Sequence, residues 1–178
     1  MLSRSNWLIL GMAVLAAGAG GYVQHLRERP AVDSAVLGQQ LPDLVLPDLD
    51  GKAHRLSDYR GRRVLLNLWA SWCKPCLEEM PALARAQAKF GDRVPIVVGI
   101  AMDDPVRARA FLDAHPVNYP VLLGRLNPPS TSSMLGNAAE TLPFSVLVDA
   151  TGRVLAVHSG PIPPAQLTQW FGPERSEP

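Results

Sequence analysis

Two cysteines at the end of an apolar stretch constrain this chain more than any other feature of its sequence. The stretch VLLNLW (64–69) runs through Ala-Ser-Trp into Cys73-Lys74-Pro75-Cys76. Such an apolar run is typical of a buried β-strand. Pro75 suits the first turn of a helix, where its missing N–H is not needed. The sequence therefore predicts a strand, a short loop and a helix, with Cys73 at the helix start and Cys76 one turn later on the same face.

The chemistry of this pair follows from the absence of other cysteines. The 178-residue chain has two, whereas structural disulfide frameworks use several at long spacings. A ring of four residues gains only about 2 kcal/mol in the loop-entropy model. Two cysteines cannot complete a four-cysteine zinc site, and no histidine lies at metal-motif spacing from them. The remaining interpretation is redox chemistry, in which Cys73 is the reactive thiolate at a helix N-terminus and Cys76 resolves a mixed disulfide.

Strand and helix signals continue on both sides of the motif. Asp50-Gly51-Lys52 is a turn signal consistent with a hairpin. Strands are predicted over 63–69, 95–101, 119–123, 144–148 and 154–158, helices over 75–90, 105–114 and 164–171, and a loop with a helical turn over 128–136. Strands that alternate with helices, followed by a hairpin and a final helix, predict an α/β fold with a mixed central sheet.

The N-terminal residues are predicted to lie outside this fold. Trp7–Val23 carries no charge, and a helix extended to residue 26 would be about 30 Å long, close to the thickness of a bilayer core. We favour an uncleaved membrane anchor over a cleaved signal peptide, although Ala17-Gly18-Ala19 offers a cleavage site. The expected organisation is an anchor at 1–26, a linker at 27–37, the redox domain at 38–172 and a tail at 173–178.

Composition and the remaining residues weigh against other functions. The net charge of +1 provides no global field to attract nucleic acid, and no cofactor or resident metal is predicted. Thiolates suit Cu(I), so the alternative function is a copper chaperone that uses Cys73, Cys76 and either His158 or Met102. The histidines are scattered and no Met-rich tract is present. A peroxidase fits less well, because a CxxC pair at a helix start suits thiol–disulfide exchange.

Four stretches together resemble the TlpA/ResA branch of the thioredoxin superfamily, the membrane-tethered reductases of the bacterial periplasm. They are PDLVLPDLDGKAHRLSDYRG, VLLNLWASWCKPCLEEMPAL, the VVGIAMDD strand with its helix, and TLPFSVLVDATGRV. The resemblance covers roughly residues 38–171. It implies a thioredoxin-like fold with an N-terminal hairpin and an αβ insertion before a cis-proline loop. In that loop Pro143 would face the cysteines, and Leu142 would pair its backbone with a substrate strand.

Four further positions bear on the reaction. Asn67 stands where the simplest thioredoxins have a buried aspartate, and it cannot accept the proton of Cys76. The resemblance implies instead that Glu79, one turn beyond Cys76, takes this proton, with Glu78 as the competing carboxylate. Trp72 is expected to pack beside Cys73 and to shape the substrate surface; the alternative is a core tryptophan.

The expected activity is reduction of disulfides in protein substrates. A CxPC motif resembles the reducing members of the superfamily. An integral-membrane thiol relay would supply the electrons to a protein anchored to the inner membrane and facing the periplasm. Candidate substrates are apocytochrome c and copper-site assembly proteins, and the sequence does not choose between them.

Overall fold

The computed structural model of the protein describes residues 36–90 and 95–172, all of which belong to the compact unit Val32–Pro178. The predicted anchor, most of the linker and the tail 173–178 lie outside the described residues. Within the described residues, no helix combines the length and apolar content needed to cross a membrane.

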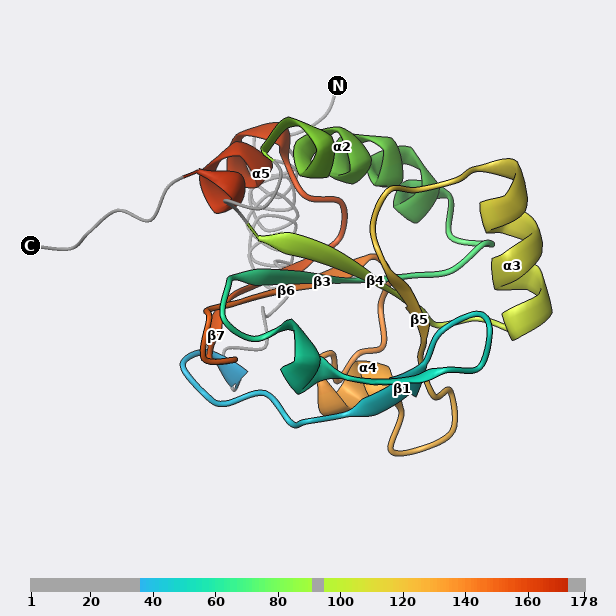
Figure 1. The fold of residues 1–178 in the computed structure, drawn as a ribbon, viewed down its shortest axis with the longest axis horizontal. Coiled ribbons are helices and arrows are strands. Elements are labelled where there is room, and N and C mark those ends of the chain that lie inside the picture. Colours follow the sequence, from blue (N-terminus) through green and yellow to red (C-terminus); the bar gives the residue numbers. More distant parts are fainter. Residues whose placement is uncertain (1–35, 91–94, 173–178) are drawn as a thin grey trace, which may run out of the picture. The chain divides into compact units, whose positions relative to one another are not determined.

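A five-stranded mixed sheet forms the centre of the fold, with the strand order β5-β4-β3-β6-β7 (Figure 1). Its strands are β3 (Val64–Trp69), β4 (Ile96–Ala101), β5 (Val121–Leu123), β6 (Phe144–Val148) and β7 (Val154–Ser159). Strands β3, β4 and β5 are parallel, whereas β6 and β7 are antiparallel to their neighbours. The central strand β3 is buried along its whole length, as its mostly apolar run predicts.

Two layers cover the faces of this sheet. The other elements are the hairpin β1 (Val45–Pro47) and β2 (Ala53–Arg55), the 3-10 helix η2 (Leu56–Tyr59), and the helices α2 (Lys74–Phe90), α3 (Pro105–Ala114), α4 (Thr131–Met134) and α5 (Pro164–Phe171). In Figure 1, α2 and α5 lie on one face, and the hairpin and α4 on the other.

Side-chain alternation along the strands explains this arrangement, because successive residues of a strand point to opposite faces. Leu65 packs in a core cluster with Leu83 of α2 and Phe171 of α5. Its neighbour Leu66 packs in a second cluster with Leu46 of the hairpin. The central strand therefore directs apolar side chains toward both faces of the sheet, because a layer covers each face.

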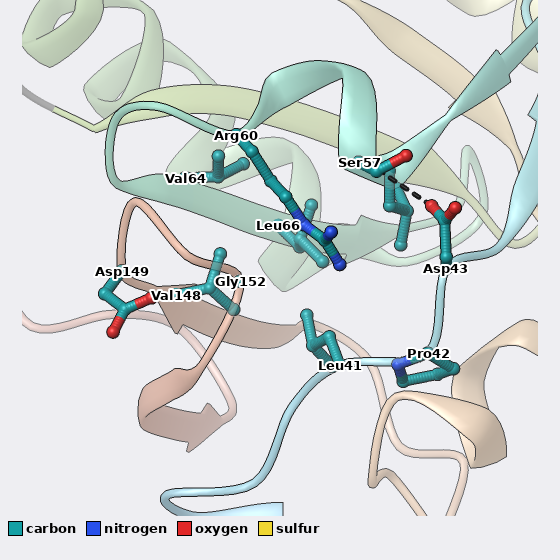
Figure 2. Close-up of a pocket in the computed structure, with 11 residues that line it drawn as sticks. Leu41, Pro42, Asp43, Ser57, Arg60, Val64, Leu66, Val148, Asp149 and Gly152 are labelled. Atoms are coloured by element: carbon teal, nitrogen blue, oxygen red, sulfur yellow. Dashed lines mark hydrogen bonds between the residues drawn. The ribbon is translucent and has the colours of Figure 1, made fainter.

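The chain before the hairpin closes one side of the second cluster, and Figure 2 shows the small cavity that remains there. The Ser57 N–H donates to Asp43 Oδ1 at 2.9 Å, which is the main reason that the pKa of Asp43 is lowered. Gly152 has φ +90°, and a Cβ on it would lie 2.7 Å from Gln40 Nε2 and 3.1 Å from Arg60 Nε. This turn therefore needs glycine for its backbone conformation, and a Cβ would also require the side chains of Gln40 and Arg60 to shift.

Most element boundaries agree with the prediction. The hairpin forms at Asp50-Gly51-Lys52, and α3, α5 and β6 have the predicted bounds. Strand β5 starts two residues late, directly after Pro120, which has no N–H to contribute to the sheet. The 3-10 helix η2 was not predicted.

Candidate active site

Cys73 lies in the loop that leaves β3, immediately before the first residue of α2. Its carbonyl oxygen accepts from the Leu77 N–H at 3.2 Å, so Cys73 is the N-cap residue of the helix. Its sulfur accepts from the Cys76 N–H at 3.3 Å, as the side-chain oxygen of an N-cap serine or aspartate does. The helix start therefore offers a donor and the positive end of its dipole to a Cys73 thiolate.

The two cysteines form a disulfide, so the structure represents the oxidised protein. Cys73 is 5% exposed and Cys76 is fully buried. The exposed area of Cys73, the predicted nucleophile, is therefore small. Of the two cysteines, Cys73 is nevertheless the one that keeps an exposed area in this state.

A buried carboxylate holds the loop between β3 and Cys73. Asp103, 5% exposed, accepts through Oδ2 from both the N–H and the hydroxyl of Ser71, at 2.7 and 2.6 Å. Its Oδ1 accepts from the Asp104 N–H at 2.8 Å, and the Met102 N–H donates to the Trp69 oxygen at 2.8 Å. The loops after β3 and β4 are therefore joined at their first residues.

The sequence analysis missed the role of Asp103. The position of Asp103 shortly after the β4 segment indicates this role, because the carboxyl ends of neighbouring parallel strands meet at one edge of a sheet.

Trp72 is 66% exposed, which excludes the alternative of a core tryptophan. It lines a cavity of about 140 Å³ together with Leu142. The structure thus brings together two of the residues predicted to bind substrate.

The Leu142–Pro143 peptide bond is cis, as the resemblance implied. Pro143 is buried, and its carbonyl oxygen accepts from the Gly160 N–H at 2.8 Å. Leu142 is half-buried against the cluster that contains both cysteines. Within the described residues, neither its N–H nor its carbonyl oxygen has a hydrogen-bond partner. Both groups can therefore bond to an extended peptide laid beside the disulfide.

Glu79 lies on α2 one turn beyond Cys76 and is 7% exposed. Its Oε1 accepts from Asn67 Nδ2 at 2.7 Å and its Oε2 from the Ile162 N–H at 2.9 Å. Burial raises the pKa of Glu79, although these two hydrogen bonds and the charge of His158 oppose the shift. Glu78 is exposed and lies 3.9 Å from Lys74. Of the two candidate carboxylates, only Glu79 occupies an environment that favours its protonated form.

The side-chain oxygen of Asn67 bears on the protonation of Glu79. Its Nδ2 also donates to Ser145 Oγ at 3.0 Å, while its Oδ1 is buried without a hydrogen-bond partner in the described residues. A rotated Asn67 amide could accept from a protonated Glu79. The sequence had indicated Asn67 and Glu79, but Ser145 and the Ile162 peptide carry no signal that would have identified them.

The described residues hold no group of three or more His, Cys, Asp or Glu side chains placed to bind a metal ion. His158 Nε2 lies 3.0 Å from the Pro161 oxygen, and Met102 is 7% exposed.

Comparison with known proteins gives consistent results. Residues 37–157 match the model of the AhpC/TSA family. The thioredoxin-like protein YneN of Bacillus subtilis is 31% identical over 170 residues, which are 92% of this chain and 95% of that protein. The thiol-disulfide oxidoreductase ResA of Geobacillus kaustophilus is 31% identical over 165 residues, which are 89% of this chain and 91% of that protein.

Solved structures agree with the sequence relatives. A crystal structure from Chlorobium tepidum, described as a thiol:disulfide interchange protein DsbE, superposes with a TM-score of 0.64 at 33% identity. The match covers 75% of this chain and 91% of that chain. The fold around the two cysteines is therefore the thioredoxin-like fold that the sequence predicted.

Proposed function

Because the chain belongs to the AhpC/TSA family and is a thiol–disulfide oxidoreductase, we propose that it reduces disulfides of protein substrates through Cys73 and Cys76. One observation carries the proposal. Leu142, whose peptide group has no hydrogen-bond partner in the described residues, packs against the cluster that contains the N-cap cysteine Cys73, while Cys76 is fully buried.

The proposed reaction transfers two electrons to the substrate. In the reduced protein the Cys73 thiolate attacks one sulfur of the substrate disulfide, which forms a mixed disulfide and releases the other substrate sulfur as a thiolate. Cys76 then loses its proton and attacks Cys73, which releases the second substrate thiolate. The protein is left with the Cys73–Cys76 disulfide that the structure contains.

Glu79 is proposed to take the proton of Cys76 in the second step. Burial disfavours the thiolate of Cys76 and also favours a protonated Glu79. A proton that moves from the sulfur to this carboxylate therefore leaves Glu79 in the neutral form that burial favours, and the thiolate that it creates is consumed as Cys76 attacks Cys73. General-base assistance of this kind is typically worth roughly 10²–10⁴-fold in rate.

The proposed direction and location rest on the sequence. Pro75 in the CxPC motif supports a reducing role, and the uncharged segment Trp7–Val23 supports an anchor in the inner membrane, with the domain 38–172 in the periplasm. A reductant must then return two electrons to the disulfide after each turnover, and an integral-membrane thiol relay would do so. Apocytochrome c and copper-site assembly proteins are the proposed substrates.

Trapping tests the proposal directly. A Cys76→Ser variant expressed in a bacterial host should accumulate as mixed disulfides between Cys73 and its substrates, identified by mass spectrometry after release with dithiothreitol. The matched control is the Cys73→Ser, Cys76→Ser double variant, which should trap none. The wild-type protein should also catalyse the reduction of insulin by dithiothreitol. Absence of both trapping and insulin reduction would exclude a reductase function.

A further inference from the structure

The cavity beside the disulfide combines apolar walls with one unpaired negative charge. Its lining comes from the loops after the three parallel strands, from the start of α4 and from the loop before β6. The residues that matter here are Trp72, Met102, Leu126, Ser130, Glu140 and Leu142. Loops at the carboxyl ends of parallel strands are where α/β proteins commonly bind ligands. The cavity is continuous with the proposed substrate site through Trp72 and Leu142.

Glu140 supplies the charge. It is exposed at the rim and accepts a hydrogen bond from Ser130 Oγ, which fixes the position of its carboxylate. Within the described residues it forms no ion pair. The guanidinium of Arg125, on a neighbouring loop, bonds instead to the Pro129 oxygen and lies beside the Met134 sulfur.

The apolar side of the cavity is unusually exposed. Trp72 is 66% and Leu126 is 53% exposed, so two large side chains on its wall lack cover. An indole face and a carboxylate in one small cavity both favour a cation, the first through its quadrupole and the second through its charge. An anionic side chain would be repelled by Glu140, and a purely apolar one would leave the carboxylate without a partner.

We propose that the cavity between Trp72 and Glu140 binds a lysine or arginine side chain of the substrate, located next to the disulfide being reduced. The stem of such a side chain would pack on Trp72, Leu126 and Leu142, and its charged end would pair with Glu140. Long basic side chains bury their stems on apolar surface in this way. The inference rests on the proposed reductase function, which it deepens by naming a substrate class.

Peptides that differ in the charge of one residue test the inference. Each carries one intramolecular disulfide, and the residue next to the first cysteine is lysine, norleucine or glutamate. The reduced full-length protein should reduce the lysine peptide with a kcat/KM about two- to fivefold above that of the glutamate peptide, the range expected for an exposed ion pair. The difference should shrink as salt is added, because salt screens exposed charges.

Variants assign the preference to Glu140. Glu140→Gln should remove the preference, and Glu140→Lys should reverse it in favour of the glutamate peptide. Asp113→Asn is the matched control: it removes one negative charge from an exposed position on α3 and should keep the preference. Equal rates for all three peptides, or a preference that survives in Glu140→Gln, would overturn the subsite while leaving the reductase function intact. Failure to reduce any peptide, together with failure to reduce insulin, would overturn both.

Discussion

At the scale of single residues, two buried carboxylates beside the disulfide are satisfied differently. Asp103 accepts three hydrogen bonds, two of them from Ser71. Glu79 accepts two, and burial outweighs them, so that its pKa is raised. Three donors and a place between two loops suit Asp103 to structural support. Fewer donors and a raised pKa suit Glu79 to gaining and losing a proton.

Glu79→Gln should slow substrate reduction near neutral pH and leave the fold intact. Without the carboxylate, Cys76 must lose its proton unassisted, so the rate should recover partly as the pH rises. The opposing effect is repulsion, since an ionised Glu79 also raises the pKa of nearby thiols. The measurement is kcat/KM for a protein disulfide between about pH 6 and 9. Unchanged or faster turnover across this pH range would show that Glu79 does not take the proton of Cys76.

The same residue should make stability depend on pH. Because the pKa of Glu79 is higher in the folded than in the unfolded chain, its contribution favours folding below the unfolded value near 4.5 and is lost as the pH rises through the folded value. The free energy of unfolding of the wild type should therefore decrease over this pH interval relative to that of Glu79→Gln. Denaturant titration of the oxidised proteins measures this difference. Glu78→Gln removes an exposed carboxyl from the same helix and should follow the wild type.

The two thiols of the reduced protein should differ in reactivity. Cys73 has a helix N-terminus to stabilise its thiolate and a small exposed area, whereas Cys76 is fully buried. Iodoacetamide at neutral pH should therefore modify Cys73 much faster, as followed by peptide mapping. Both should react at similar rates in the denatured chain. Faster modification of Cys76 in the folded protein would reverse the assignment of nucleophile and resolving thiol.

Sequence reasoning found the residues that carry a local pattern and missed those defined by tertiary contact. The cysteine spacing and the apolar strand before it located Cys73 and Cys76, and the resemblance supplied Glu79 and Pro143. Nothing local marks Ser145 or the Ile162 peptide, which approach Asn67 and Glu79 from distant parts of the chain. Glu140 was not predicted as a site residue, because its proposed role depends on Trp72, 68 positions earlier in the chain.

At the scale of elements, local signals decided the boundaries. Helix α3 starts at Pro105 after Asp104, whose side chain accepts from the Val106 and Arg107 N–H groups; proline in the first turn is a strong start signal. Strand β5 was predicted too long because its apolar residues extend back across Pro120, where the sheet cannot. The link between the loops after β3 and β4 required the strand order, which the sequence left open.

Asp103→Asn should destabilise the protein by about 1–3 kcal/mol, the cost of leaving a buried polar group without a partner. The asparagine oxygen can replace only one carboxylate oxygen, so its NH₂ group would face either the Ser71 or the Asp104 N–H. Asp104→Asn is the matched control: asparagine is as good an N-cap as aspartate, and stability should change little. Denaturant unfolding of the oxidised variants measures the difference. Equal stability of the two variants would show that Asp103 does not hold the loop.

At the scale of the whole molecule, the proposed substrate site lies at one end of the sheet. The parallel strands β3 and β4 end there, and β6, which runs the other way, begins there, since Leu68 is paired with Phe144. The nucleophile, the Asp103 support and the Leu142 peptide therefore come together from segments up to 69 residues apart. The sheet fixes the spacing of these three groups, whereas the loops that carry them can change their contacts with substrate.

The last prediction concerns how the whole chain is held in the cell. Trp7–Val23 has the length and lack of charge of a membrane-spanning helix, and the described residues 36–90 and 95–172 belong to one compact unit. Full-length protein expressed in a bacterial host should therefore remain in membranes after a carbonate wash, which removes peripheral proteins. A chain that starts at Val32 should fold, reduce insulin and appear in the soluble fraction. A mature N-terminus near Gly20 would show that the segment is a cleaved signal peptide, and the periplasmic protein would then act without a tether.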